Sequence, residues 1–397
     1  MPKHGFHLAL ATASTAVIAT LLSGCGSQAQ QTTGPKPPAT VPKETLTAAA
    51  NDSAYAYISG QWVYLPPSTT NNVPSDPFHA LDFSTNGTPT ATTIGSDGNM
   101  FDGNQSSLWE YDKGWQSVSI NGDTSIGVHA WSPTNTLYAA ADDGQTLGIW
   151  YSSKGHWHLV QGSSSLGYIE SIQWSPAGVL TVTSEVSDGS TAVSQYTGGQ
   201  WKHLDDAHMP FAADTLQVSW SPKGVLTVAT SQHGVWQYTN GVWSQPGGKS
   251  PIDTVAQVGW SPQGELVISG NTSQSRGLFA LENGTWTSLG SSTAASPTHG
   301  ILEFGWSPSG TLTVSDSTTD KIYQLTSGKW VTIWDKTSPS DRDASAPSFQ
   351  WSPSGTLTCD GGDLGGLWQY QNGKWVQIGG DQSPFRNVTS VIYGWSK

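Results

Sequence analysis

Trp260-Ser261-Pro262-Gln263-Gly264 is the stretch that decides the fold, because the chain repeats its first three residues at nearly constant spacing. Complete copies of Trp-Ser-Pro begin at Trp131, Trp174, Trp220, Trp260, Trp306 and Trp351, and a last copy reads Trp395-Ser396-Lys397. Successive copies lie 43, 46, 40, 46, 45 and 44 residues apart. A degenerate copy, Phe83-Ser84-Thr85-Asn86-Gly87, lies 48 residues before Trp131. A fixed period of about 40 to 50 residues indicates a repeat architecture.

One repeat predicts four short strands joined by turns. Pro262 lacks a backbone donor and Gly264 tolerates a positive φ, so Pro-x-Gly indicates a turn after the first strand. Asn283-Gly284 is a strong hairpin signal between the third and fourth strands. The expected strands are 257–260, 265–269, 277–282 and 285–289. A repeated four-stranded antiparallel unit of this length is typical of a β-propeller blade.

Aromatic residues form two further columns in the repeat. A Trp, usually in Gly-x-Trp, recurs at Trp62, Trp115, Trp157, Trp201, Trp243, Trp286, Trp330 and Trp375. A third column holds Tyr55, Trp109, Trp150, Trp236, Phe279, Tyr323 and Trp368. Together the columns contain all but one of the 20 tryptophans, the exception being Trp334. We interpret them as filling between blade faces, and a glycan-binding surface of indoles is the alternative.

The two ends of the repeat region complement each other. Residues 391–397 copy a first strand and stop, while residues 42–50 resemble residues 222–230, which follow a first strand. Pairing of the C-terminal strand with three N-terminal strands would close the ring and remove its exposed edges. We therefore expect an all-β, eight-bladed propeller over residues 44–397. Seven blades are the alternative, because the Phe83 copy is degenerate.

The aromatic-Ser-Pro-x-Gly turn resembles the first-strand turn of WD-repeat and TolB-like propellers. The resemblance covers residues 44–397 and implies a propeller fold. The chain departs from those families in that Asp never follows the Pro of the turn. Its sole Trp-Asp, Trp334-Asp335, lies outside the columns. The resemblance accordingly implies architecture and no activity.

The N-terminus predicts export and a lipid anchor. Residues 1–24 read as a signal peptide, with Lys3 followed by an apolar, small-residue stretch from Leu8 to Leu22. Leu22-Ser23-Gly24-Cys25 resembles the bacterial lipobox, which implies a diacylated Cys25 at the mature N-terminus. An ordinary signal peptide with a chance Cys is the alternative. Residues 25–43 are expected to be the lipidated Cys and a flexible tether, which places the propeller outside the cytoplasm on a bacterial membrane.

Composition narrows the function classes. The chain has 397 residues, with 16 Lys and Arg against 29 Asp and Glu and a net charge of −13. Nucleic acid is excluded as a partner because binding phosphate requires a basic stripe. Cys359 is the only cysteine besides Cys25, so a lipidated Cys25 leaves no intramolecular disulfide. Cys359 occupies a strand position that is Val in other repeats, and we expect it to be buried.

Few residues are candidates for catalysis, metal binding or ligand contact. His129 interrupts an apolar column two residues before the first-column aromatic, which makes it a candidate ligand contact, and a histidine satisfied by the backbone is the alternative. Trp334 is a second candidate because it lies outside the columns. His156 and His158 share one strand face without a clear third ligand, and the acidic turn Asp97–Asn104 lacks a calcium-loop pattern. We expect no metal, no cofactor and no catalytic residue of recognised motif.

These observations favour a non-enzymatic binding or scaffold protein. Its partners would be the membrane, through the lipid on Cys25, and a protein or glycan ligand, and the chain is expected to be a monomer. A lectin-like glycan binder is the first alternative. A propeller hydrolase or lyase is the second, since a carboxylate pair can come from separate blades.

Overall fold

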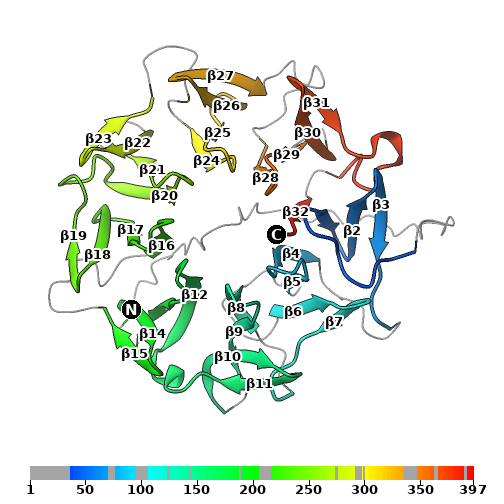
Figure 1. Ribbon diagram of the computed structural model, residues 1–397, viewed down its shortest axis with the longest axis horizontal. Helices are drawn as coiled ribbons and strands as arrows, with labels where there is room; N and C mark the ends of the chain where they lie inside the picture. The colour runs from blue at the N-terminus through cyan, green and yellow to red at the C-terminus, as the bar shows by residue number, and fades with distance from the viewer. Residues whose placement is uncertain are drawn as a thin grey trace, which may run out of the picture.

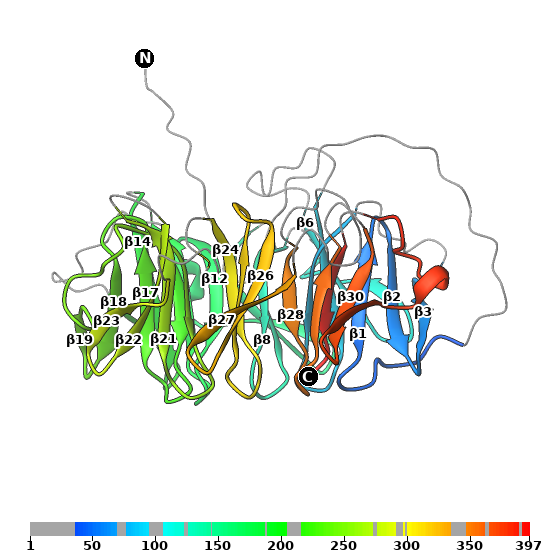
Figure 2. The ribbon, with the colours of Figure 1, turned by 90° about the horizontal axis from the view of Figure 1, so that it is seen from above.

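The chain forms a ring of eight four-stranded antiparallel sheets, seen along its axis in Figure 1. The structure, a computed structural model, describes residues 36–69, 77–94, 106–122, 126–143, 145–186, 189–204, 216–272, 276–290, 297, 300–334, 347–361, 365–388 and 391–397. Figure 2 shows the ring from its edge, as a disc with strands running between its two faces. The predicted eight-bladed propeller is confirmed, and the seven-bladed alternative is wrong.

Each blade is numbered here in chain order, with its innermost strand first. Blade 1 contains β32 (Ile392–Trp395), β1 (Leu46–Ala50), β2 (Ser53–Ile58) and β3 (Gln61–Leu65). Blade 2 contains β4 (Phe78–Phe83), β5 (Pro89–Ile94), β6 (Ser106–Tyr111) and β7 (Trp115–Ser117). Blade 3 contains β8 (Ile126–Trp131), β9 (Leu137–Asp142), β10 (Leu147–Ser153) and β11 (His156–Leu159). Blade 4 contains β12 (Tyr168–Trp174), β13 (Leu180–Glu185), β14 (Thr191–Thr197) and β15 (Gln200–His203).

The second half of the ring follows the same plan. Blade 5 contains β16 (Leu216–Trp220), β17 (Leu226–Thr230), β18 (Val235–Thr239) and β19 (Val242–Ser244). Blade 6 contains β20 (Thr254–Trp260), β21 (Leu266–Asn271), β22 (Arg276–Glu282) and β23 (Thr285–Ser288). Blade 7 contains β24 (Ile301–Trp306), β25 (Leu312–Asp316), β26 (Lys321–Thr326) and β27 (Lys329–Trp334). Blade 8 contains β28 (Phe349–Trp351), β29 (Leu357–Asp360), β30 (Leu367–Gln371) and β31 (Lys374–Gln377).

Helical structure is confined to single turns in the part of the chain that the structure describes. The 3₁₀ helices η1 (Ser163–Ser165) and η3 (Gly380–Gln382) each cover three residues. Within the same residues, no helix combines the length and the apolar character that crossing a bilayer requires.

A serine closes the turn at the end of each innermost strand. In blade 6, Ser261 Oγ accepts a 2.9 Å hydrogen bond from the Glu265 N–H, and the Ser261 carbonyl accepts one of 2.9 Å from the Gly264 N–H. Gly264 has a φ of +90°, and Asn135 takes the equivalent position in blade 3 with a φ of +64°. The Ser-Pro-x-Gly sequence therefore recurs because every blade uses the same turn. Its fourth position needs a positive φ, which Gly and Asn tolerate best.

Blade 1 reproduces this turn with the two ends of the chain. Ser396 Oγ accepts a 2.8 Å hydrogen bond from the Thr45 N–H, and the Ser396 carbonyl accepts one of 3.0 Å from the Glu44 N–H. Glu44 takes the place of the turn glycine, with a φ of +54°. Figure 1 shows β32, in red, beside the blue strands of the same sheet. The predicted closure of the ring by N-terminal and C-terminal strands is thus present.

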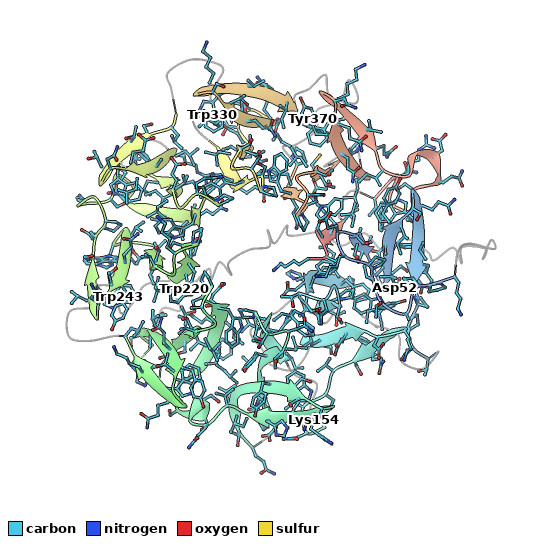
Figure 3. The ribbon with its side chains drawn as sticks, viewed as in Figure 1. Asp52, Lys154, Trp220, Trp243, Trp330 and Tyr370 are labelled. Carbon is cyan, nitrogen blue, oxygen red and sulfur yellow. The ribbon has the colours of Figure 1, made fainter. Side chains whose placement is uncertain are left out.

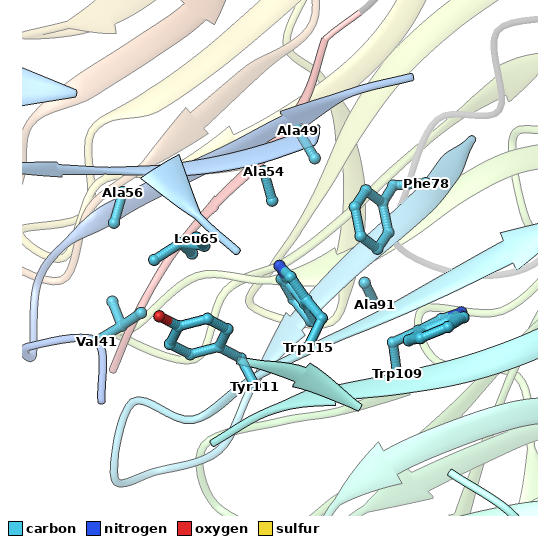
Figure 4. Packing of buried hydrophobic residues seen from close by; sticks show 10 residues of the cluster. All are labelled: Val41, Ala49, Ala54, Ala56, Leu65, Phe78, Ala91, Trp109, Tyr111 and Trp115. Carbon is cyan, nitrogen blue, oxygen red and sulfur yellow. The ribbon is translucent and has the colours of Figure 1, made fainter. Parts of the chain in front are cut away.

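The hydrophobic core is divided among the interfaces between neighbouring blades. At the interface of blades 1 and 2, small residues of one sheet face aromatic residues of the next, as Figure 4 shows. Ala49, Ala54 and Ala56 lie opposite a group that includes Phe78 and Trp115, whose ring centroids are 5.1 Å apart. Alternation of small and large side chains lets flat sheets pack without voids.

The segment before blade 1 joins this interface. Val41 is 2% exposed and packs in the same cluster. Its neighbours are fixed by backbone contacts, because the Tyr111 hydroxyl donates a 2.9 Å hydrogen bond to the Pro38 carbonyl and the Lys113 N–H donates one of 2.9 Å to the Ala39 carbonyl. The ordered propeller therefore begins before Glu44, within the segment that composition assigned to the tether.

Candidate functional site

Two of the three tryptophan columns have structural roles, one between neighbouring blades and one within each blade. Second-column indoles donate from Nε1 to a carbonyl of the preceding blade, as Trp243 does to Leu204 at 2.7 Å and Trp330 does to Leu289 at 2.7 Å. Trp62, Trp201, Trp286 and Trp375 make the same kind of contact. Third-column indoles donate within their own blade, from Trp109, Trp150, Trp236 and Trp368. These tryptophans serve packing, and Figure 3 shows Trp243 and Trp330 toward the rim of the ring.

The candidate Trp334 belongs to the core. Its side chain is 1% exposed and meets Trp375 edge to face at 5.1 Å. A register shift between Ile322 and Tyr323 on β26 places Trp334 opposite Ile322 at the end of β27. Contact with a ligand would require this interface to open.

The candidate His129 lies on β8 between blades 2 and 3. Its Nε2 is 3.2 Å from the Thr90 hydroxyl, which also accepts a 3.2 Å hydrogen bond from Trp131 Nε1. Burial lowers the pKa of His129, and the nearby Asp82 carboxylate opposes that shift. The partner is a side-chain hydroxyl of the neighbouring blade, where the sequence suggested a backbone carbonyl. The imidazole is thus part of a polar junction between two blades.

The other candidate groups remain apart. His156 and His158 are exposed on the outermost strand β11. No group of three His, Cys, Asp or Glu side chains that could hold a metal occurs among the described residues. The turn Asp97–Asn104 and the predicted lipidation site Cys25 lie outside the described residues. Cys359 is buried, as expected, and burial raises its pKa well above the usual range.

The first tryptophan column differs from the other two in position, because it lies on the innermost strand of each blade. Its indoles end the innermost strands of seven blades and are half-buried: Trp131, Trp174, Trp220, Trp260, Trp306, Trp351 and Trp395. Phe83, which replaces Trp in blade 2, is 4% exposed. Figure 3 shows Trp220 on the inner side of its blade. The first column thus presents repeated, partly accessible indoles near the axis of the ring.

Polar side chains also bridge the innermost strands, and the sequence reasoning missed them. Gln257, three residues before Trp260, donates a 2.9 Å hydrogen bond to the Phe304 carbonyl and accepts one of 2.8 Å from the Phe304 N–H. Glu303 occupies the same position in blade 7 and accepts a 2.5 Å hydrogen bond from the Phe349 N–H. Gln350, one residue before Trp351, donates one of 2.9 Å to the Tyr393 carbonyl. The sequence signal for these bridges is a polar residue on the strand face opposite the apolar column.

Two adjoining pockets lie along these bridges. The first has a volume of about 270 Å³ and lies between blades 7 and 8. It is lined by Glu303, Phe304, Gly305, Trp306, Phe349, Gln350 and Trp351. The second has a volume of about 320 Å³ and shares Trp306, Gln350 and Trp351 with the first. It continues over the serine turns of blades 6 to 8 to Trp395 and Lys397.

Burial and two nearby carboxylates shift the pKa values of the groups beside the first pocket. The Tyr393 hydroxyl is buried and donates to the Ser348 carbonyl at 2.8 Å. Burial raises its pKa well above the usual range, and the Asp360 and Glu303 carboxylates add to the shift. The same two carboxylates act on Cys359. The tyrosine and the thiol are therefore neutral at ordinary pH.

The fold and these recesses define a closed eight-bladed β-propeller with aromatic pockets on its inner wall. No protein-family model and no curated protein matches the chain. Among solved structures it is similar to Porphyromonas gingivalis dipeptidyl peptidase 4, with 12% identity, a TM-score of 0.58, and coverage of 85% of this chain and 58% of that one. The Dos1 propeller shares 12% identity at a TM-score of 0.51, with coverage of 78% and 86%.

Virginiamycin B lyase from Staphylococcus aureus shares 13% identity at a TM-score of 0.45, with coverage of 71% of this chain and 90% of that one. Identities this low show a common fold alone. The function has to be argued from the site.

Proposed function

We propose that the chain is a lipid-anchored, extracytoplasmic binding protein whose ligand occupies the inner wall of blades 6 to 8 and blade 1. The acylated Cys25 would hold the propeller on the outer side of a bacterial membrane, and two acyl chains suffice for durable attachment. The propeller itself would present the two adjoining pockets to a protein or glycan without changing it chemically.

One observation carries this proposal. Partly accessible indoles line the pockets, and the polar groups beside them are already used in hydrogen bonds between blades. Trp306 and Trp351 line both pockets and are half-buried. Glu303 and Gln350, the polar residues beside them, bridge neighbouring blades through backbone hydrogen bonds. A general acid or base has to exchange its proton with the substrate, whereas these groups keep the ring in register. Such a wall is suited to binding.

A lectin-like function is supported by one distinct observation. Half-buried indoles end the innermost strands of seven blades, so a sugar ring could stack at several equivalent positions. In that case binding would depend on many members of the column, and a single pair of pockets would not dominate.

Matched substitutions within the first column distinguish these functions. The full chain carrying Cys25→Ser, secreted without its anchor, would be screened on glycan and peptide arrays alongside Trp351→Phe and Trp220→Phe. Loss of a bound ligand with Trp351→Phe alone supports the pockets, because Trp220 lies in the same column but does not line them. Equal losses support the lectin-like function. Binding that survives both substitutions overturns the proposed site.

Two further measurements test the rest of the proposal. Mass spectrometry of the released ligand is expected to show no chemical change, and a converted ligand would indicate a hydrolase or lyase. Fractionation of cells is expected to find the native chain in the membrane and Cys25→Ser in the soluble fraction. Equal distribution of the two chains would contradict the lipid anchor.

A further inference from the structure

We propose that one face of the ring rests on anionic lipid head groups, so that the opposite face points away from the membrane. The contacting face is the end of the blades that carries the serine turns and the hairpins between the third and fourth strands. This inference rests on the lipid anchor of the proposed function. It deepens that function by naming the surface through which the anchored propeller would contact the bilayer.

The turn face, as we call this surface, is one end of every blade. In an antiparallel sheet, the turn between the first two strands and the turn between the last two lie at the same end. The serine turns are residues 84–88, 132–136, 175–179, 221–225, 261–265, 307–311 and 352–356, with 396–397 and 42–45 at the ring closure. The hairpins, each with one residue on either side, are 58–61, 111–115, 153–156, 197–200, 239–242, 282–285, 326–329 and 371–374. Figure 2 shows this end as the lower face of the disc, where the C-terminus lies.

Lysine ammonium groups are concentrated on the turn face. Exposed lysines occur there at seven positions in six blades: Lys43, Lys113, Lys154, Lys223, Lys329, Lys374 and Lys397. Carboxylates occur at four positions, Glu44, Asp112, Glu265 and Glu282. The ends of the blades lie at one level in Figure 2, so lysines from different blades can meet one flat surface. A bilayer whose head groups carry negative charge is such a surface.

The opposite end of the blades has the reverse balance of charge among the described residues. Its turns and connections contain four bases, Lys249, Arg276, Lys321 and Arg386. They contain nine acids, Asp52, Asp142, Asp143, Glu185, Asp253, Asp316, Asp320, Asp360 and Asp381. The net charge of −13 is therefore distributed unevenly between the two faces.

The thickness of the ring limits repulsion from these acids. The innermost strands β16 and β20 have five and seven residues. At about 3.3 Å per residue, the two faces are about 17 to 23 Å apart. Electrostatic interactions in water decay over about 10 Å at 0.1 M salt. A membrane at the turn face would consequently be attracted by the near lysines and repelled only weakly by the far carboxylates.

The N-terminal segment enters the ring along the turn face. The Tyr111 hydroxyl, beside the hairpin of blade 2, donates a 2.9 Å hydrogen bond to the Pro38 carbonyl. Ser396 Oγ, in the closing serine turn, donates one of 2.6 Å to the Pro42 carbonyl. The segment between these contacts therefore lies on this face, and the exposed Lys36 precedes it by two residues. A lipid attached upstream would pull on the face that carries the lysines.

The short link to the predicted anchor makes a weak attraction sufficient. Cys25 precedes Lys36 by eleven residues, and covalent geometry limits that link to about 40 Å. A propeller held this closely meets the bilayer as an intramolecular partner, at a high effective concentration. Each lysine near an anionic leaflet favours the bound orientation about fivefold. The lysines thus have to orient the ring, while the lipid supplies the attachment.

The aromatic residues beside the serine turns suit the same surface. The half-buried tryptophans of the first column end the innermost strands, directly before these turns. Tryptophan favours the boundary between water and lipid, where its ring is apolar and its N–H group can stay hydrated. The second pocket extends over the serine turns of blades 6 to 8 and so lies on the turn face. The ligand of the proposed function would accordingly be bound at the surface of the bilayer.

A chemically anchored chain tests this orientation. The mature chain, residues 25–397, would be coupled through the Cys25 thiol to a maleimide lipid, which leaves the buried Cys359 unmodified. It would be placed on vesicles of equal parts phosphatidylglycerol and phosphatidylcholine, or of phosphatidylcholine alone, at about 0.1 M salt. A membrane-impermeant acetylating reagent then modifies the exposed lysines, and mass spectrometry measures the rate at each one.

Lysines of the two faces serve as internal controls for each other. On the anionic vesicles we expect the turn-face residues Lys113 and Lys223 to react more slowly by about threefold or more than on phosphatidylcholine. Lys249 and Lys321, on the opposite face, should react at the same rate on both. The inference is overturned if the lysines of the turn face are not protected, or if those of the opposite face are protected equally.

Matched variants separate the turn face from the total charge. One variant removes three positive charges from the turn face: Lys154→Gln, Lys329→Gln and Lys374→Gln. The other removes three from the opposite face: Lys249→Gln, Arg276→Gln and Lys321→Gln. We expect the first to abolish the protection of Lys113 and Lys223, and the second to leave it within about twofold. Equal effects of the two variants would contradict the proposed contact surface.

These outcomes are separable from the proposed function, because the maleimide lipid anchors the chain whether or not cells acylate Cys25. Equal labelling of both faces removes the orientation, while cell fractionation still decides the natural anchor. If the native chain is found in the soluble fraction but its turn-face lysines are protected on anionic vesicles, the lipid-binding surface stands and the acylation of Cys25 fails.

Discussion

Single indole N–H groups link six of the outer strands to the preceding blade. Trp330 makes one of the shorter of these bonds, at 2.7 Å to the Leu289 carbonyl. Trp330→Phe keeps an aromatic side chain at this position but removes the indole N–H donor. We expect the free energy of unfolding to fall by about 1 to 2 kcal/mol, the cost of a partly buried carbonyl that loses its partner. Urea denaturation measures it. Val331→Ala, on the same strand and 47% exposed, is the control, and an equal loss there would contradict the hydrogen-bond explanation.

His129 should make stability depend on pH. Burial places its pKa below the ordinary value of 6.5, so the unfolded chain takes up a proton before the folded one does. Stability from the neutral imidazole is therefore present above about pH 6.5 and is lost as the pH falls. We expect the free energy of unfolding to drop as the pH falls below about 6.5, and His129→Gln to flatten that slope. Denaturant titrations at several pH values decide it, and an unchanged slope would remove His129 as the cause.

Single residues also show which features of the site can be predicted from the sequence and which cannot. His129 could be found because it interrupts an apolar column, and the structure places it at a polar junction between blades. Glu303 was missed because its role depends on reaching the backbone of the next blade, which no pattern within one repeat reveals. Trp334 stood out because it lies four residues after Trp330, outside the columns, and the structure shows that it is a buried interface residue beside Trp375.

Among the elements, the serine turn is the repeated unit whose loss should matter most at the ring closure. Ser396 Oγ accepts from the Thr45 N–H at 2.8 Å and donates to the Pro42 carbonyl at 2.6 Å, so it joins segments far apart in the chain. We expect Ser396→Ala to cost about 2 to 3 kcal/mol, at the upper end for buried hydrogen bonds. Ser261→Ala, within a continuous turn, should cost about 1 kcal/mol. Chemical denaturation compares them, and equal costs would show that the closure has no special weight.

The repeat predicts where each strand lies, but it does not predict at which residue the strand begins and ends. In blade 6 the expected strand 257–260 is observed as β20 from Thr254, with a register shift between Val255 and Gln257. The expected strand 265–269 is observed as β21, Leu266–Asn271. Alternation of side chains identifies a strand but carries no information on irregular pairing at its ends. Turn residues were more reliable, because positive φ restricts the choice of side chain.

For the whole molecule, the split blade predicts that the ring tolerates new chain ends but not the loss of its closing strand. Joining Ser396 directly to Pro42 would recreate the Ser-Pro-Lys turn found at Ser221, and new ends can be opened between Gly198 and Gly199, which are exposed in a hairpin turn. This permutant loses Val41, a buried side chain worth about 1.5 to 3 kcal/mol. The covalent turn offsets part of that loss, because it removes the entropy of bringing the two ends together.

We expect the permutant to unfold in one transition within several degrees of the native midpoint. A chain that lacks residues 391–397 should unfold at a much lower temperature, because β1 would lose its partner strand and become an exposed edge. Thermal denaturation followed by circular dichroism, with tryptophan fluorescence as a second probe, compares the two chains. A permutant as unstable as the truncated chain would mean that the native connection of the blades, and not the closing sheet, maintains the ring.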